Sequence, residues 1–362
     1  MLFPPVRSYL KVQPITPSKL KRILVVRSDR IGDVILSTPV FSAIKEKYPH
    51  CYLAVLVDQS VETLVRGNPF VDEVIAYDKK GKHRSWWRTL WLGIGLRKYH
   101  FDLAIHLHPT NRVHILSWLA GIPIRIGYCR KNHYLLTHSI EERKRLGKRH
   151  EAEYNFDLLQ FIHIPAPHRL KLYVPLHPED KNELKMLAPD LKDPYVVYHP
   201  SASCPSKIWP PERMAELANS LAHECGTFSV IVASGSGVNE ANLMEMHLKQ
   251  SYMNLGGKLS LGMLGWLLKG ARLLVSNDSG PVHFASAVGT PVISIFGRNQ
   301  AGLSPTRWKP LGERSSFVHK NVGCVECLAH DCKLGFKCLQ ELSVNDVLGE
   351  IKKLEIFEQN RK

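Results

Sequence analysis

The stretch 23-ILVVRSDRIGDVIL-36 decides the fold. Its first four residues are apolar and predict a strand that is buried on both faces, and Val34 and Ile35 begin a pattern typical of a helix. Between the two lies a short polar turn that contains Gly32 and Asp33. A strand that passes directly into a helix is the repeating unit of α/β proteins. The residues leave open whether Asp33 only caps the helix or acts as a reactive carboxylate.

The same alternation of strand and helix continues in two series. Further strands are predicted at 52–57, 73–78 and 101–108, and then at 195–200, 228–234, 272–278 and 291–297. Helices are predicted at 34–47, 60–67, 211–226, 261–271 and 279–289. This order predicts mostly parallel sheets with helices on both faces. A segment rich in proline and charge, 173–183, separates the two series.

We therefore expect two Rossmann-like domains, residues 1–175 and 176–362, with the last helix as a candidate for packing back on the first domain. A length of 362 residues agrees with two cores better than with one. In open α/β sheets, ligands bind outside the carboxyl ends of the strands, so the site is expected in a cleft between the domains.

The net charge of +15 is confined to the first half of the chain. Residues 1–150 hold 26 Lys and Arg against 11 Asp and Glu, whereas residues 151–362 hold 22 of each. Such asymmetry indicates an acidic partner for the first half. Nucleic acid, an anionic membrane surface and a phosphorylated glycolipid all meet this description. No apolar run approaches the ~20 residues of a membrane span, and no signal peptide is recognisable, so we expect a soluble cytoplasmic protein.

The segment 272-RLLVSNDSGPVHF-284 predicts an anion site. A strand ends near Asp278, and a helix begins with Pro281 at a position where a missing N–H costs nothing. The free amides of the first helical turn attract negative charge, and Gly280 lets a ligand approach the backbone. Asp278 could instead be only a cap, and His283 could be a core histidine.

The segment 199-HPSASCPSKIWPPERM-214 follows another predicted strand. Its loop of small residues exposes backbone amides, and Lys207 suits a diphosphate. The alternative is a solvated loop lysine. Asp33 in its turn is, on spacing alone, more typical of a helix cap than of a catalyst.

Taken together, these segments resemble glycosyltransferase family 9, the ADP-heptose:lipopolysaccharide heptosyltransferases. The resemblance runs from about residue 21 to 345 and is carried by ILVVRSDRIGDVILSTPVFSAIKEKYP, HPSASCPSKIWPPERMAELA, NLGGKLSLGMLGWLLKGARLLVSNDSGPVHFASAVGTPVISIFG and the cysteine-bearing tail. It implies a GT-B fold, in which two Rossmann-like domains face a cleft and the second holds the nucleotide sugar.

The resemblance also implies roles for individual residues. Asp33 matches the catalytic aspartate, Lys207 matches a lysine that neutralises the donor diphosphate, and Arg30 and Gly32 lie on the acceptor side. The donor-binding residues are expected to be Ser201, Ser203, Asn254, Leu255, Asp278, Ser279, Gly280 and His283.

The resemblance further implies an inverting, metal-independent transfer of a heptose from ADP-heptose to a lipopolysaccharide inner-core acceptor. A carboxylate can accept the proton of the acceptor hydroxyl, and Lys207 can stabilise the leaving diphosphate. No Asp-x-Asp motif is present, and no cofactor is expected. The alternatives are a transferase of another nucleotide-diphosphate sugar, a sugar-nucleotide epimerase or hydrolase, and a non-catalytic nucleic-acid-binding protein. No recognised motif supports nucleic acid as a partner.

The segment 79-KKGKHRSWWRTLWLGIGLRKYH-100 holds seven Lys and Arg and no acid, with tryptophans between the charges. This composition suits an anionic membrane interface, so a peripheral position at the inner-membrane face is expected. The alternative is a surface helix whose tryptophans pack on the sheet. A second basic stretch at 125–150 would suit an acceptor that carries carboxylates and phosphates.

Four cysteines cluster near the end of the chain, and their spacing makes a zinc site chemically possible. They are Cys324, Cys327, Cys332 and Cys338. Only the first pair has the spacing of a zinc knuckle, so reduced, packed thiols are the favoured interpretation and no metal is expected.

Overall fold

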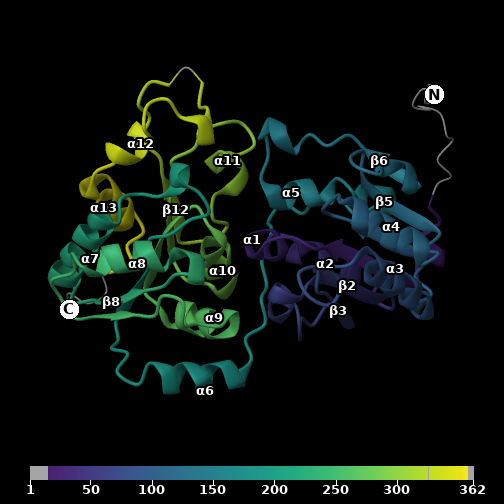
Figure 1. Ribbon diagram of the computed structural model, residues 1–362, viewed down its shortest axis with the longest axis horizontal. Coiled ribbons are helices and arrows are strands. Elements are labelled where there is room, and N and C mark those ends of the chain that lie inside the picture. The colour runs from purple at the N-terminus through teal and green to yellow at the C-terminus, as the bar shows by residue number, and fades with distance from the viewer. Residues whose placement is uncertain (1–14, 325, 358–362) are drawn as a thin grey trace.

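The computed structural model describes residues 15–324 and 326–357 and contains two six-stranded parallel sheets (Figure 1). The first sheet has the order β3-β2-β1-β4-β5-β6, and the second has the order β12-β11-β10-β7-β8-β9. The strands of the first sheet are β1 (Arg22–Arg27), β2 (Tyr52–Asp58), β3 (Glu73–Tyr77), β4 (Leu103–His106), β5 (Ile124–Tyr128) and β6 (His138–Ile140). Those of the second are β7 (Tyr195–His199), β8 (Phe228–Ile231), β9 (Tyr252–Asn254), β10 (Leu273–Asn277), β11 (Val292–Ile295) and β12 (Ser315–Val318).

The helices cover both faces of each sheet, as parallel sheets require. In the first half they are α1 (Ile31–Ile35), α2 (Thr38–Lys47), α3 (Trp86–Gly95), α4 (Asn111–Leu119) and α5 (Glu151–Phe156). In the second half they are α6 (Pro178–Leu187), α7 (Pro211–Cys225), α8 (Val238–Glu245), α9 (Leu261–Gly270), α10 (Gly280–Val288), α11 (Pro305–Trp308), α12 (Lys337–Gln340) and α13 (Val344–Lys353).

Strand β1 shows how the sequence directs this layering. Its residues Ile23 and Val25 pack into the core shared with α1 and α2, whereas Leu24 and Val26 pack into a separate core on the other face. Successive side chains of a strand point to opposite faces, so a run of four apolar residues requires a cover on each side. The predicted buried strand at 23–26 is therefore confirmed.

Two expectations about helices are wrong in detail. The predicted helix 34–47 is two helices, α1 and α2, which are separated at Leu36 and Ser37. The last helix of the described residues, α13, contacts α7, β11 and β12 and buries Val347 and Ile351 in the second domain's core. It does not pack back on the first domain, because its apolar face is buried in the core of the second domain.

The two halves meet where α1 contacts α10 (Figure 1). A side-chain carbon added at Gly32 would lie 2.8 Å from the ring of His283, and one added at Gly280 would lie 3.2 Å from Ile31. Both helices begin just beyond the carboxyl end of a central strand, β1 or β10. The carboxyl edges of the two sheets therefore face each other, which is the placement predicted for the site.

Candidate functional site

Asp33 lies in the first turn of α1 and is held by Arg27 at the end of β1. The Arg27 guanidinium donates from Nη2 to Asp33 Oδ1 over 2.6 Å, and the Asp33 side chain is 18% exposed. Burial raises the pKa of Asp33 to about 6, and Asp29 and Glu151 add to the rise while Arg27 opposes it. A carboxyl group with this pKa is partly protonated near neutrality and can exchange a proton with a ligand.

The alternative of a helix cap is wrong for Asp33. The residue that precedes α1 is Arg30, and no side chain caps this helix. Asp33 is fixed by its ion pair with Arg27 instead of by the backbone amides of the turn. Of the two residues expected on the acceptor side, Arg30 is exposed and Gly32 is buried against α10.

Glu151, the first residue of α5, connects this carboxylate to the rest of the protein. It is 1% exposed and pairs with three cations, two of which come from distant segments. The distances from its carboxylate oxygens are 2.7 Å to Lys144 Nζ, 3.3 Å to Arg27 Nη2 and 2.6 Å to Arg307 Nη2. These cations lower the pKa of Glu151 against the effect of its burial, so it is ionised. Because Arg307 belongs to the second half, this network joins the two domains.

Lys207 and Asp278 meet at the facing edge of the second sheet. Lys207 Nζ lies 2.9 Å from Asp278 Oδ2 and also donates to the Asp278 carbonyl oxygen over 2.9 Å. Arg298 Nη2 lies 2.9 Å from the same Oδ2. The alternative of a solvated loop lysine is wrong, because the Lys207 side chain is only 14% exposed. Asp278 does not cap α10 either, since that helix has no side-chain cap.

His199 ties the loop after β7 to the loop after β10. Ser201 Oγ lies 3.3 Å from His199 Nε2, and Ser279 Oγ lies 3.2 Å from His199 Nδ1. Burial lowers the pKa of His199 to about 4, so the ring is neutral. Asn277 adds a bond from Nδ2 to the Pro200 carbonyl over 2.6 Å. Ser201 and Ser279 are therefore fixed in one hydrogen-bonded unit, whereas Ser203 is exposed outside it.

His283 lies between the two charged clusters. Its ring is 3% exposed, packs near Trp308 at a centroid distance of 6.4 Å, and faces Gly32 of α1. Burial lowers its pKa to about 3, and the nearby His150 and Lys207 lower it further, whereas the acids Asp278 and Glu151 oppose the shift. His283 is therefore a neutral ring within electrostatic range of both domains' charges. Its Nδ1 is buried and has no hydrogen-bond partner within the described ranges.

Asn254 and Leu255 lie at the carboxyl end of β9, on the edge of the second sheet. Asn254 donates to Glu245 over 2.6 Å and accepts from the Gly256 amide over 2.9 Å, and Leu255 is buried. Two strand spacings separate β9 from β7, which is roughly 10 Å. Asn254 and Leu255 therefore lie apart from Lys207 and Asp278. Only an extended ligand that lies along the sheet edge could contact both pairs of residues.

The sequence did not predict four charged residues of the site. These residues are Arg27, Glu151, Arg298 and Arg307. Arg27 and Arg298 lie at the carboxyl edge of a central strand, as Asp33 and Lys207 do, so their position offered a signal. The pairs of Glu151 with Arg27 and with Arg307 offered none, because they join residues that are far apart in the sequence.

The zinc alternative is not supported. Across residues 15–324 and 326–357, no three His, Cys, Asp or Glu side chains are grouped to hold a metal ion. Cys338 Sγ donates to the Gly297 carbonyl over 3.0 Å, and Cys327 Sγ accepts from the Asn299 amide over 3.4 Å. Burial raises the pKa of Cys338, and the other three thiols raise it further. Cys327 and Cys338 are thus held by hydrogen bonds to the backbone, whereas Cys324 is exposed.

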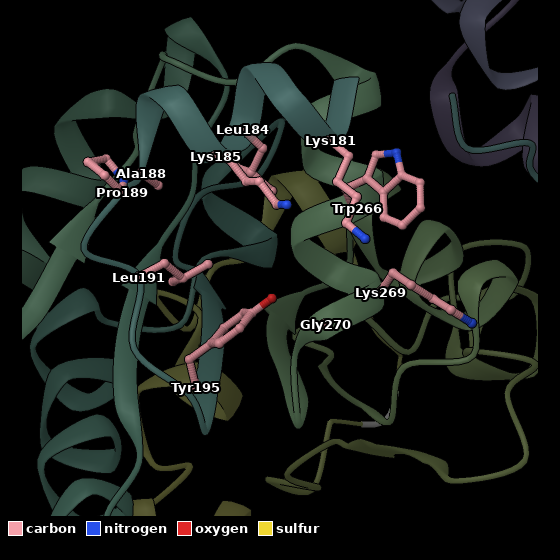
Figure 2. Close-up of a pocket in the computed structure, with 10 residues that line it drawn as sticks. All are labelled: Lys181, Leu184, Lys185, Ala188, Pro189, Leu191, Tyr195, Trp266, Lys269 and Gly270. Atoms are coloured by element: carbon pink, nitrogen blue, oxygen red, sulfur yellow. The ribbon is translucent and has the colours of Figure 1, made fainter. Parts of the chain in front are cut away.

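A separate pocket of about 680 Å³ lies between α6 and α9 (Figure 2). Figure 2 shows Lys181 beside Trp266 and Tyr195 directed into the space beneath α6. None of the residues that the sequence predicts for the site lines this pocket. The predicted residues Asp33, Lys207, Asp278 and His283 lie instead around the contact between α1 and α10.

Comparison with known proteins identifies the family of this chain. Residues 89–337 match the family described as glycosyltransferase family 9 (heptosyltransferase). Lipopolysaccharide core heptosyltransferase OpsX of Haemophilus influenzae is 27% identical over 372 positions, which cover 95% of this chain and 100% of that protein.

Two solved structures share the fold. The glycosyl transferase family 9 structure from Veillonella parvula has a TM-score of 0.80 at 23% identity and covers 94% of this chain and 98% of its own. The structure of E. coli ADP-heptose lps heptosyltransferase II has a TM-score of 0.76 at 23% identity and covers 93% and 99%. The expected GT-B architecture of two Rossmann-like domains is thus confirmed. The family match spans more than half of the residues of this chain. The chain therefore belongs to glycosyltransferase family 9 and is a glycosyltransferase.

Proposed function

We propose that this enzyme transfers a heptose from ADP-heptose to the inner core of lipopolysaccharide, with inversion and without a metal. The observation that carries the proposal is that Asp33, a partly buried carboxylate, faces a cationic cluster across the α1–α10 contact. The names of the relatives support the donor and the acceptor: one is a lipopolysaccharide core heptosyltransferase and another an ADP-heptose lps heptosyltransferase.

Asp33 is the proposed general base. It accepts the proton of the acceptor hydroxyl while the hydroxyl oxygen forms a bond to the anomeric carbon of the heptose. The bond from that carbon to the diphosphate oxygen breaks in the same step, and ADP leaves with the electron pair. Attack opposite the leaving group inverts the anomeric centre, and Asp33 then returns its proton to solvent.

Lys207 and Arg298 are proposed to stabilise the leaving diphosphate. Both are held by Asp278, so their charges are positioned before the substrate arrives. The amides at the start of α10, next to Gly280, add positive potential. Ser201, Ser279 and His283 are proposed to contact the donor sugar and phosphates. Preorganised charge of this kind acts on the transition state without a metal.

The remaining donor contacts follow from the second sheet. With the diphosphate at β7 and β10, the adenosine would extend toward Asn254 and Leu255 at β9. In this proposal residues 176–362 form the donor domain and residues 1–175, which carry the excess positive charge, form the acceptor domain. The acceptor is an anionic glycolipid, so we place the enzyme at the cytoplasmic face of the inner membrane.

The test is turnover with ADP-heptose and with other ADP-, UDP- and GDP-sugars, using a deacylated inner-core acceptor. We expect ADP release and an anomerically inverted product with ADP-heptose, in the presence of EDTA. Consumption of another donor in preference to ADP-heptose would contradict the proposed donor. Retention of configuration, or loss of activity in EDTA, would contradict the proposed mechanism.

A further inference from the structure

Helix α3 exposes an apolar stripe that globular packing does not explain. Trp87, Trp91 and Ile94 are spaced i, i+4 and i+7 along it and are 73%, 70% and 40% exposed. Side chains at this spacing share one face of a helix and normally form its buried face. The alternative that these tryptophans pack on the sheet is therefore wrong.

The opposite, small-residue face of α3 does the packing. A side-chain carbon at Gly93 would lie 3.1 Å from the Leu116 carbonyl oxygen of α4, so glycine allows the two helices to approach closely. Thr89 is buried and donates to the His83 carbonyl over 3.0 Å. Figure 1 shows α3 and α4 side by side. Since Thr89 and Gly93 anchor the helix, the tryptophans are not needed for its stability.

Positive charge surrounds the stripe. Segment 79–100 contains seven Lys and Arg and no acid. Lys80, Lys82 and Arg88 are exposed, and none forms an ion pair with an acid of the described chain. On α4, the helix packed against α3, Trp118 is also exposed, and Arg112 lies over the Trp86 ring at 4.9 Å.

We propose that this surface, formed by residues 79–100, binds an anionic lipid bilayer. Tryptophan is the side chain that prefers the headgroup region, and exposed lysines supply attraction to anionic lipids. Tryptophan and arginine also occur at protein interfaces, but lysine is depleted there, so the exposed lysines favour a bilayer over a protein partner. The inference rests on the proposed function, since a glycolipid acceptor brings the enzyme to a membrane. Among the described residues no helix could cross a bilayer, so attachment would be peripheral.

The surface is linked to the reactive edge of the first sheet. Helix α3 follows the carboxyl end of β3, and α1 with Asp33 follows the carboxyl end of β1, so both begin at the same edge. Lys79 donates from Nζ to the Ser28 carbonyl over 2.7 Å, in the turn that leads to α1. Docking of the surface therefore places Asp33 near the headgroups, where a glycolipid presents its sugars.

The test is co-sedimentation of the full chain with vesicles of phosphatidylglycerol and phosphatidylcholine, compared with pure phosphatidylcholine. We expect binding to the anionic vesicles only, weakened by high salt. Trp87→Ala with Trp91→Ala should lower the partition coefficient roughly tenfold or more, because binding scales with buried apolar area. Lys80→Glu with Lys82→Glu should lower it by at least about fivefold per residue.

The matched control is Leu243→Ala with Met246→Ala, which removes exposed apolar side chains from the second domain and should bind as the wild type does. Wild-type protein that ignores anionic vesicles, or a tryptophan variant that binds normally, would overturn the proposal. A dimer that the tryptophan variant abolishes, without vesicle binding, would assign the surface to a second copy instead.

Turnover of the water-soluble, deacylated acceptor separates this inference from the proposed function. The tryptophan variant should keep wild-type turnover, because its side chains touch no part of the donor site. Vesicle binding without turnover of any donor would contradict the proposed function and leave the surface standing. Turnover without vesicle binding would contradict the membrane-binding surface and leave the proposed function standing.

Discussion

Two opposing influences set the reactivity of Asp33. Burial favours its protonated form, whereas Arg27 at 2.6 Å favours its carboxylate. The outcome is a pKa of about 6, because burial outweighs the effect of Arg27 and the negative charges of Asp29 and Glu151 raise the pKa further. A general base works best when its pKa lies near the working pH. The network therefore gives Asp33 more basicity than a solvent-exposed aspartate has.

Asp33→Asn should remove this base while preserving the shape of the site. We expect kcat to fall by about 10²–10⁴-fold, the contribution of a positioned acid or base. At pH 8 the free energy of unfolding of the variant should equal that of the wild type or exceed it by up to about 2 kcal/mol, because the fold disfavours the ionised Asp33 carboxylate. Thermal unfolding measures this difference. Asp190→Asn, at an exposed site, is the control. Near-normal turnover of a folded Asp33→Asn enzyme would remove Asp33 from the mechanism.

The pH dependence of kcat should show the same group. Below pH 6 we expect kcat to fall about tenfold per pH unit, because Asp33 becomes protonated. Folding stability should depend on pH in the opposite direction to kcat. The pKa of Asp33 is higher in the folded than in the unfolded protein, so the stability that Asp33 contributes is largest at low pH and is lost as the pH rises through about 6. Initial rates from pH 5 to 9 measure the first effect. A flat profile would contradict the assignment.

Lys207→Ala should weaken both donor binding and the leaving-group step. We expect a higher KM for the donor and a kcat lowered by about 100-fold, the effect of removing one preorganised donor to a developing charge. Steady-state kinetics with ADP-heptose, alongside the exposed control Lys192→Ala, measure the change. Unchanged kinetics would show that Lys207 only neutralises Asp278.

At the level of elements, the sequence predicted where the site residues lie better than it predicted which residues form ion pairs with each other. Asp33, Lys207 and Asp278 were found because each follows a strand whose apolar run identifies it, and parallel strands bring their carboxyl ends to one edge. The ion pairs of Glu151 could not be found this way. Its partners Arg27 and Arg307 lie 124 and 156 residues away, and nothing local in the α5 sequence encodes them.

Glu151→Gln tests whether α5 acts on Asp33 through Arg27. Loss of one buried partner should destabilise the fold by about 3–5 kcal/mol. A purely structural role would stop there. Because the Glu151 charge raises the pKa of Asp33, the acid limb of the kcat profile should also move to lower pH. Denaturation and the pH profile are measured on the same protein, and an unmoved limb would contradict the coupling.

At the level of the whole molecule, the site depends on how closely the two domains approach. Asp33 belongs to one sheet and the Lys207–Asp278–Arg298 cluster to the other, and α1 and α10 are the elements that bring them together. Gly32 and Gly280 lie at this contact. Because glycine has no side chain, the two helices can approach closely there. The Arg307–Glu151 pair, at 2.6 Å, fixes the same approach electrostatically.

Gly32→Ala should therefore separate the two half-sites without removing any reactive group. The new methyl carbon would lie 2.8 Å from His283 Cδ2, and the ring cannot yield easily because it is buried beside Trp308. A misplacement of about 1 Å can cost about 100-fold in rate. We expect kcat to fall by that order. The control is Gly349→Ala in α13, whose added carbon meets nothing within 4 Å and should stabilise its helix by up to about 1 kcal/mol. Wild-type kinetics in Gly32→Ala would mean that the domains reach their reactive positions without close contact between α1 and α10.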